Sequence, residues 1–330
     1  MEGNMSGALR RGLGGGIIML LGAGMAWGEE GKPAPPPPPS LMAQMGASKT
    51  VQEVYKEDLA LAKSAELKKL LARKMVEDSK GEKGANRYAL LATAVDLNCD
   101  AGDLSGALAA IGVMESSFSI DAVKIKADAA TAAAKGARSV EDRKAFVEQV
   151  HGVIVGAVDA DRYDLARPLA DMAAEKARST NDAELYRRAA ADVQQVRDTE
   201  SAFAEVKRSV AVLAEKADDA DANLKVGRFR CLLKGDWERG LPLLAKGSDA
   251  ALKALAEKEL AGVKDVEEQV KLADAWWELS DTMAGGSRSN VRTHAAKWYQ
   301  EALPTMTKGF TKLKVETRIK DAQGESKKPK

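Results

Sequence analysis

Proline is almost absent from the long central part of this chain. Residues 41–328 contain only Pro168, Pro242 and Pro304, although the whole sequence of 330 residues has 10 prolines. Apolar residues in this part recur at three- and four-residue steps and do not alternate, which is typical of helices. Aromatic residues make up only 5% of the chain, which disfavours a strand-rich sandwich or barrel. The sequence therefore predicts an all-α protein.

The first clear helical pattern is an apolar stripe from Val51 to Met75. Lysine and glutamate residues occupy the opposite face, as expected for an amphipathic helix. The pattern weakens at Lys63 and Ser64, so the helix is predicted to break there.

Three short segments share one turn pattern and indicate an internal repeat. They are Ala101-Gly102-Asp103-Leu104, Ala160-Asp161-Arg162-Tyr163 and Lys234-Gly235-Asp236-Trp237. In this pattern a glycine is expected to end the first helix where a positive φ is needed, an aspartate can cap the second helix, and a large residue packs across the turn. A small residue follows three positions later and lets the two helices approach closely.

This pattern resembles the turn and second helix of tetratricopeptide-type hairpins. The large residues of the three turns lie 59 and 74 residues apart, whereas a regular array repeats every about 34 residues. The repeats are therefore predicted to be divergent or interrupted. The expected architecture is an array of antiparallel helical hairpins forming a right-handed solenoid or a bundle, and an ordinary helical bundle with common turn chemistry is the alternative.

The start of the chain has the features of an export signal. Arg10 and Arg11 precede an apolar run, and the small residues Ala26 and Gly28 suit a signal-peptidase site. An uncleaved membrane anchor is the alternative, but the run is short and rich in glycine. The sequence predicts export to a periplasmic or extracellular location with the signal cleaved, and membrane contact only through an uncleaved signal.

Composition divides the chain into five segments. A proline-rich stretch, with six prolines in residues 33–39, predicts an extended spacer after the signal. The predicted segments are a signal peptide (1–28), a proline-rich linker (29–48), N-terminal helical repeats (49–217), a tryptophan-rich helical module (218–321) and a basic tail (322–330).

The most distinctive stretch begins at Asp218 and ends near Pro304. It contains the run Gly-Asp-Trp-Glu-Arg-Gly-Leu-Pro-Leu-Leu-Ala-Lys-Gly-Ser-Asp over residues 235–249 and the pair Trp276-Trp277. This stretch resembles a helical module of exported planctomycete proteins that generally has no assigned activity, and the resemblance extends over residues 85–320. The resemblance implies a family and brings no catalytic residues with it.

The sequence carries no recognisable catalytic, cofactor or metal motif. The chain has 50 Lys+Arg against 49 Asp+Glu, which argues against binding nucleic acid. His151 and His294 lie outside any hydrolase, protease or zinc motif and are expected at the surface or in caps. Cys99 and Cys231 fall at equivalent places in separate hairpins, so two free buried thiols are expected. The chain is predicted not to be an enzyme, with no cofactor and no metal.

The function that follows is binding of a protein or peptide partner in the cell envelope. In helical arrays, exposed polar residues on the first helix of each hairpin give specificity. The candidate partner-binding residues are Asn223, Lys225, Arg228, Arg230, Asp274 and Glu278.

Two other functions remain open. Trp237, Trp277 and Trp298 could form an aromatic surface for a saccharide or the cell wall, although large core residues are the simpler interpretation. Trp276 and Trp277 point about 100° apart on one helix, so one is expected in the core and the other at a seam or at the surface. The third function is an accessory domain of an envelope enzyme.

Overall fold

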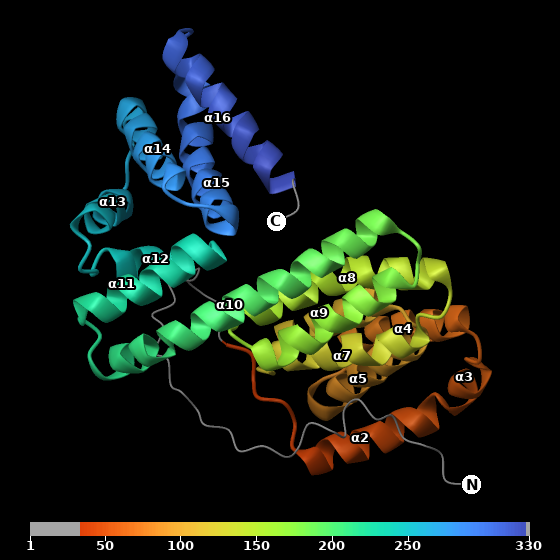
Figure 1. Cartoon of the computed structure of the whole chain (residues 1–330). Coiled ribbons are helices and arrows are strands. Elements are labelled where there is room, and N and C mark those ends of the chain that lie inside the picture. The colour runs from red at the N-terminus through yellow and green to blue at the C-terminus, as the bar shows by residue number, and fades with distance from the viewer. Residues whose placement is uncertain (1–33, 328–330) are drawn as a thin grey trace. The chain divides into compact units, whose positions relative to one another are not determined.

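The computed structural model describes residues 34–327, and every regular element in that range is a helix (Figure 1). The predicted all-α class is confirmed. The predicted signal peptide, residues 1–28, lies outside the described residues. Over the part of the chain that the structure describes, no helix has both the length and the apolar character needed to cross a membrane.

Contacts between residues divide the chain into two compact units, which meet between Ala190 and Ala191. This point lies inside a long helix, α10 (Ala183–Glu215), whereas composition had placed the division at residue 218. The first turns of α10 belong to unit 1, where Asp182 just before the helix pairs with Lys144 at 2.8 Å. The change of composition at residue 218 marks the end of this helix rather than the unit boundary.

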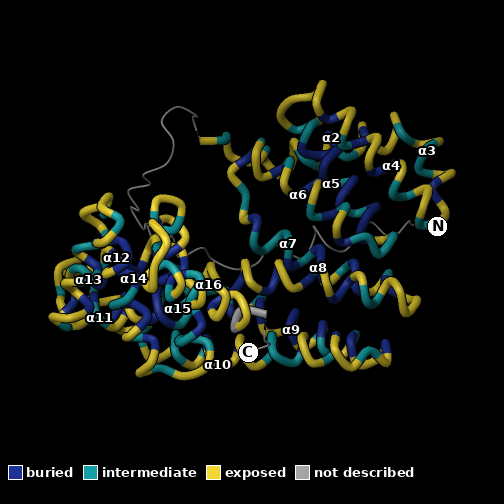
Figure 2. Tube along the Cα trace, turned by 90° about the horizontal axis from the view of Figure 1, so that it is seen from above, coloured by how far each residue is buried: buried dark blue, intermediate teal, exposed yellow. Residues whose placement is uncertain are grey.

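Unit 1 is built from helices that pack mainly against their neighbours in sequence. Its elements are α2 (Leu41–Val54), α3 (Lys56–Leu61), α4 (Ala65–Asp78), the 3-10 turn η1 (Ser79–Gly81), α5 (Gly84–Asp100), α6 (Leu104–Ser117), α7 (Ala122–Gly136), α8 (Val140–Asp159), α9 (Tyr163–Arg178) and the start of α10. Buried residues lie on the sides of the helices that face each other (Figure 2).

Unit 2 follows the same principle around its own core. Its elements after α10 are α11 (Ala220–Arg228), the π-helical turn η2 (Phe229–Lys234), α12 (Trp237–Leu244), α13 (Ala250–Leu260), α14 (Val266–Asp281), α15 (Gly285–Ala302), the 3-10 turn η3 (Leu303–Thr305) and α16 (Phe310–Lys327). The last three α-helices pack as consecutive neighbours, α14 on α15 and α15 on α16.

The three turns predicted as repeats have the same backbone conformation. Gly102, Asp161 and Gly235 all have positive φ, at 72°, 56° and 71°. In each turn the N–H of the next residue donates to a carbonyl five or six residues earlier, at 2.8 Å in all three cases. The large residue that begins the second helix is buried each time, and it is Leu104, Tyr163 or Trp237.

Aspartate caps the second helix in two of these turns. The Asp103 side chain accepts from the N–H of Gly106 at 2.9 Å, and Asp236 accepts from Arg239 at 3.2 Å. In the middle turn the aspartate occupies the positive-φ position, and the N-cap residue Arg162 makes no side-chain capping hydrogen bond. The shared turn is therefore confirmed, while its aspartate serves two different purposes.

The proline-rich linker ends earlier than composition suggested. The helix α2 already begins at Leu41, where the Ser40 hydroxyl accepts from the N–H of Ala43. The carbonyl of Pro36 accepts the N–H of Ser119 at 2.8 Å, which fixes this part of the linker to unit 1. The last residues of the predicted linker, 41–48, are thus helical.

The helix predicted over Val51–Met75 is three helices. The chain breaks at Tyr55 as well as near Lys63 and Ser64, and α2, α3 and α4 result. The apolar stripe is not wholly buried, because Val54 is 71% exposed and Leu70 is 63% exposed. Each short helix turns its own face to the core, so one continuous stripe cannot describe all three.

Candidate functional site

The six residues predicted to bind a partner lie on two segments of unit 2. Four belong to α11 and η2, and two belong to α14. Among the first four, Asn223 is fully buried, and its amide donates to the carbonyls of Ala217 and Asp219 at 3.0 and 2.9 Å. The expectation that Asn223 faces a partner is corrected: its helical position points inward, and it secures the start of α11.

The remaining residues of this set differ in how accessible they are. Lys225, Arg228 and Glu278 are exposed. Arg230 is half-buried and pairs with Asp236 at 3.0 Å, next to the turn that begins α12. None of the six candidate side chains lines the cavity formed by Trp277 and α16.

A buried polar cluster occupies the core of unit 2. The ring of His294 stacks on Trp237, with centroids 3.6 Å apart and an interplanar angle of 8°. Glu259 lies 2.9 Å from Nε2 of His294 and accepts the indole N–H of Trp276 at 2.8 Å. The expectation that His294 lies at the surface or in a cap is wrong, since the residue is only 5% exposed.

Three of the tryptophans pack in or against this buried cluster. Two of them, Trp237 and Trp298, were candidates for an aromatic surface, and the third is Trp276. Trp237 is buried against His294, and Trp276 is completely buried against Glu259. Trp298 is half-buried and packs against the same core. These large side chains fill the space between helices that are rich in alanine.

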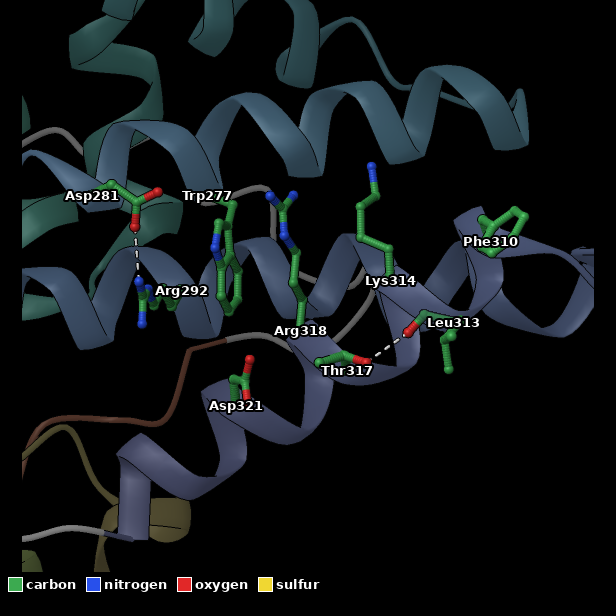
Figure 3. Close-up of a pocket in the computed structure, with 9 residues that line it drawn as sticks. All are labelled: Trp277, Asp281, Arg292, Phe310, Leu313, Lys314, Thr317, Arg318 and Asp321. Atoms are coloured by element: carbon green, nitrogen blue, oxygen red, sulfur yellow. Dashed lines mark hydrogen bonds and ion pairs between the residues drawn. The ribbon is translucent and has the colours of Figure 1, made fainter.

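Trp277 lies on the other side of α14, as the 100° step between adjacent helical residues predicts. The guanidinium carbons of Arg292 and Arg318 lie 4.7 and 5.2 Å from the centroid of its ring. Figure 3 shows the ring between these two groups. Cations stacked on an indole are attracted by its π-electrons. The side chain is buried, with 6% exposed, and its flat faces are covered by residues of this chain.

Beside Trp277 lies a groove of about 600 Å³. Its walls come from α14, α15 and α16. Two apolar side chains at one end are strongly exposed, Phe310 at 93% and Leu313 at 60% (Figure 3). Large exposed apolar groups beside a groove are characteristic of surfaces that bind other molecules.

The α16 wall is held by Asp274, one of the predicted partner-binding residues. Its carboxylate accepts from Tyr299, Lys314 and Arg318, each at 2.6 Å. Burial and the bond to Asp274 raise the pKa of Tyr299 above its usual value. Asp274 is thus engaged within unit 2, where it joins α14, α15 and α16 and shapes the groove.

A second ion pair lies at the other end of the groove. Arg292 pairs with Asp281 at 2.8 Å and donates to the hydroxyl of Ser280 at 3.1 Å. Asp321 also lines this end, is exposed, and has no ion-pair or hydrogen-bond partner among the described residues.

Neither cysteine is placed for nucleophilic chemistry. Both thiols are buried and unbridged, as predicted. Burial, with help from nearby acidic groups, raises the pKa of Cys99 to about 12 and also raises that of Cys231. No three metal-ligating side chains of His, Cys, Asp or Glu gather within residues 34–327.

The sequence prediction missed the groove residues on α16. A signal for them exists, because α16 carries two apolar sets. Val315, Ile319 and Ala322 recur at helical spacing and are buried, whereas Phe310 and Leu313 do not belong to that stripe and are exposed. An apolar pair outside the core-facing stripe of a terminal helix is therefore the pattern to look for.

Comparison with protein-family models, with curated proteins and with solved structures gives no match to this chain.

Proposed function

We propose that the chain is an exported binding protein, without catalytic activity of its own, that holds a peptide segment of a partner protein in the groove between α14, α15 and α16. The observation that carries this proposal is the exposure of Phe310 and Leu313 at one end of a groove of about 600 Å³. An apolar side chain of a partner would cover both residues and remove their surface from water.

Three features of the sequence and fold support this reading. The signal-like residues 1–28 favour a place in the cell envelope, and the three equivalent turns support a divergent relation to tetratricopeptide-type hairpins. The resemblance to exported planctomycete proteins is in keeping with both. The saccharide alternative has no comparable support, because Trp237 and Trp277 are buried against His294 and two arginines.

Selection of a random heptapeptide library on the full chain tests the proposal. We expect peptides retained by the wild-type protein to be lost on the Phe310→Ser and Leu313→Ser variants. Leu260→Ser is the matched control, since Leu260 is 51% exposed on α13 and does not line the groove. Retention that is equal on all four proteins, or no retained peptide at all, would contradict a peptide-binding groove.

A further inference from the structure

Not every charged side chain that lines the groove has an ion-pair partner. Lys314 and Arg318 both pair with Asp274, and Arg292 pairs with Asp281. Each cation at the groove therefore has a carboxylate partner within unit 2. Asp321 is the groove carboxylate that has no partner among the described residues.

The unpaired carboxylate of Asp321 and the exposed apolar side chains lie at opposite ends of the groove. Figure 3 shows Asp281 and Asp321 at the end near Trp277, and Phe310 and Leu313 at the other end. At the Trp277 end Arg292 pairs with Asp281 and Arg318 pairs with Asp274, so Asp321 is the carboxylate there whose charge no cation of the described residues offsets by pairing. The groove thus offers an apolar contact and an anionic contact to the same ligand.

The spacing of these contacts follows from α16 itself. Asp321 lies eight residues after Leu313 and eleven after Phe310, which corresponds to about 12 and about 16 Å along a helix. An extended peptide covers that distance in about four or five residues.

We propose that the groove selects a peptide that carries an apolar or aromatic side chain and, four or five residues away, a lysine or arginine. The apolar side chain packs on Phe310 and Leu313, and the cation pairs with Asp321. This inference rests on the proposed peptide-binding function and specifies the chemistry of the partner.

An acidic residue in the same peptide position is disfavoured for two reasons. It would face Asp321 directly, and like charges in proximity repel. The nearby cations Lys314 and Arg318 are already engaged, since each pairs with Asp274 at 2.6 Å. The selectivity therefore follows from the internal pairing of Lys314 and Arg318 as much as from Asp321.

Three labelled heptapeptides test the charge preference by fluorescence polarisation with the full chain. Each carries Phe at its second position and Lys, Glu or Ser at its sixth. For the wild-type protein we expect the Lys peptide to bind about three- to fivefold more tightly than the Ser peptide, as for an exposed ion pair, and the Glu peptide to bind most weakly. The difference should shrink at high salt.

Charge reversal at Asp321 is the decisive comparison. Asp321→Lys should reverse the order, so that the Glu peptide binds best. Glu316→Lys, on the same helix but outside the groove lining, makes the same change in net charge and should leave the order unchanged. Equal binding of the Lys and Glu peptides, or the same reversal in Glu316→Lys, would overturn the proposed selectivity.

The two proposals fail in different ways. If the random library yields no peptide that depends on Phe310 and Leu313, peptide binding itself is wrong. If library peptides do depend on these residues but the charge order is absent, the groove binds peptides and only the preference for a basic residue is wrong.

Discussion

At the scale of single residues, unit 2 depends on positions where no larger side chain fits. A Cβ added to Gly240 would lie 2.3 Å from the sulfur of Cys231, and one added to Gly227 would lie 2.8 Å from Leu244. These glycines let α12 approach η2 and α11 closely. The comparison of the three turns in the sequence predicted a small residue at position 240. The structure shows the reason, because a larger side chain there would clash with the sulfur of Cys231.

Gly240→Ala should destabilise unit 2 by about 1–3 kcal/mol, the usual cost of overpacking a core. Gly156→Ala is the control of opposite sign, since Gly156 lies within α8 with nothing within 4 Å of an added Cβ. There alanine should stabilise by about 0.5–1 kcal/mol, because it favours helix. Urea unfolding followed by circular dichroism measures both. A neutral Gly240→Ala would contradict the tight contact.

The two cysteines should be inert in the folded protein. Burial raises the pKa values of both thiols, that of Cys99 to about 12, so at pH 8 only about one Cys99 thiol in ten thousand is ionised. An Ellman assay should detect no thiol before denaturation and two afterwards. Rapid reaction of either thiol in the native protein would show that its core opens readily.

At the scale of elements, a polar network holds the last helix in place. Asp274 accepts hydrogen bonds from α15 through Tyr299 and from α16 through Lys314 and Arg318. The apolar contribution of α16 is small, with Val315, Ile319 and Ala322 buried. The attachment of α16 is thus shared between a short apolar seam and one carboxylate.

Asp274→Ala should destabilise unit 2 by about 1.5–3 kcal/mol, the range for a hydrogen bond to a charged group. Hydrogen exchange should speed up in α16 first, because both of its cations lose their partner. Glu278→Ala, an exposed site one turn later on α14, should change stability by no more than about 0.5 kcal/mol. Unchanged exchange in α16 would show that the apolar seam suffices.

Short sequence patterns predict where many of the helices begin and end. They do not predict which faces of the helices pack against each other. Asp103 and Asp236 mark helix starts from sequence alone, because capping is decided within four residues. Asn223 and His294 were misplaced because helical periodicity alone does not say which polar side chain turns inward. The groove was missed because Asp274 and Arg318 lie 44 residues apart, and only tertiary packing brings them together.

At the scale of the whole molecule, each unit has its own core. The unit 1 core includes Leu91 and Met114, and the unit 2 core includes Trp276 and Tyr299. The helix α10 runs through the boundary between the units. Composition could not locate this boundary, because a continuous helix shows no change of pattern where its contacts change.

Separate cores predict separate responses to mutation. Gly240→Ala should lower hydrogen-exchange protection in α14 and leave α5 unchanged, because the substitution acts on the core of unit 2. Hydrogen exchange with mass spectrometry resolves both helices in one experiment, and Gly156→Ala is again the control. Equal loss of protection in both helices would mean that α10 transmits the change and that the chain unfolds as one cooperative unit.

The hydrogen bond between Ser119 and Pro36 sets the reach of the chain's beginning. Seven residues separate Gly28, the predicted end of the signal, from Pro36, and even fully extended they span no more than about 25 Å. Three of the six prolines of the run, Pro37 to Pro39, follow this bond and add nothing to that distance. If the chain is held by its first residues, the short segment before Pro36 therefore keeps unit 1 close to the point of attachment.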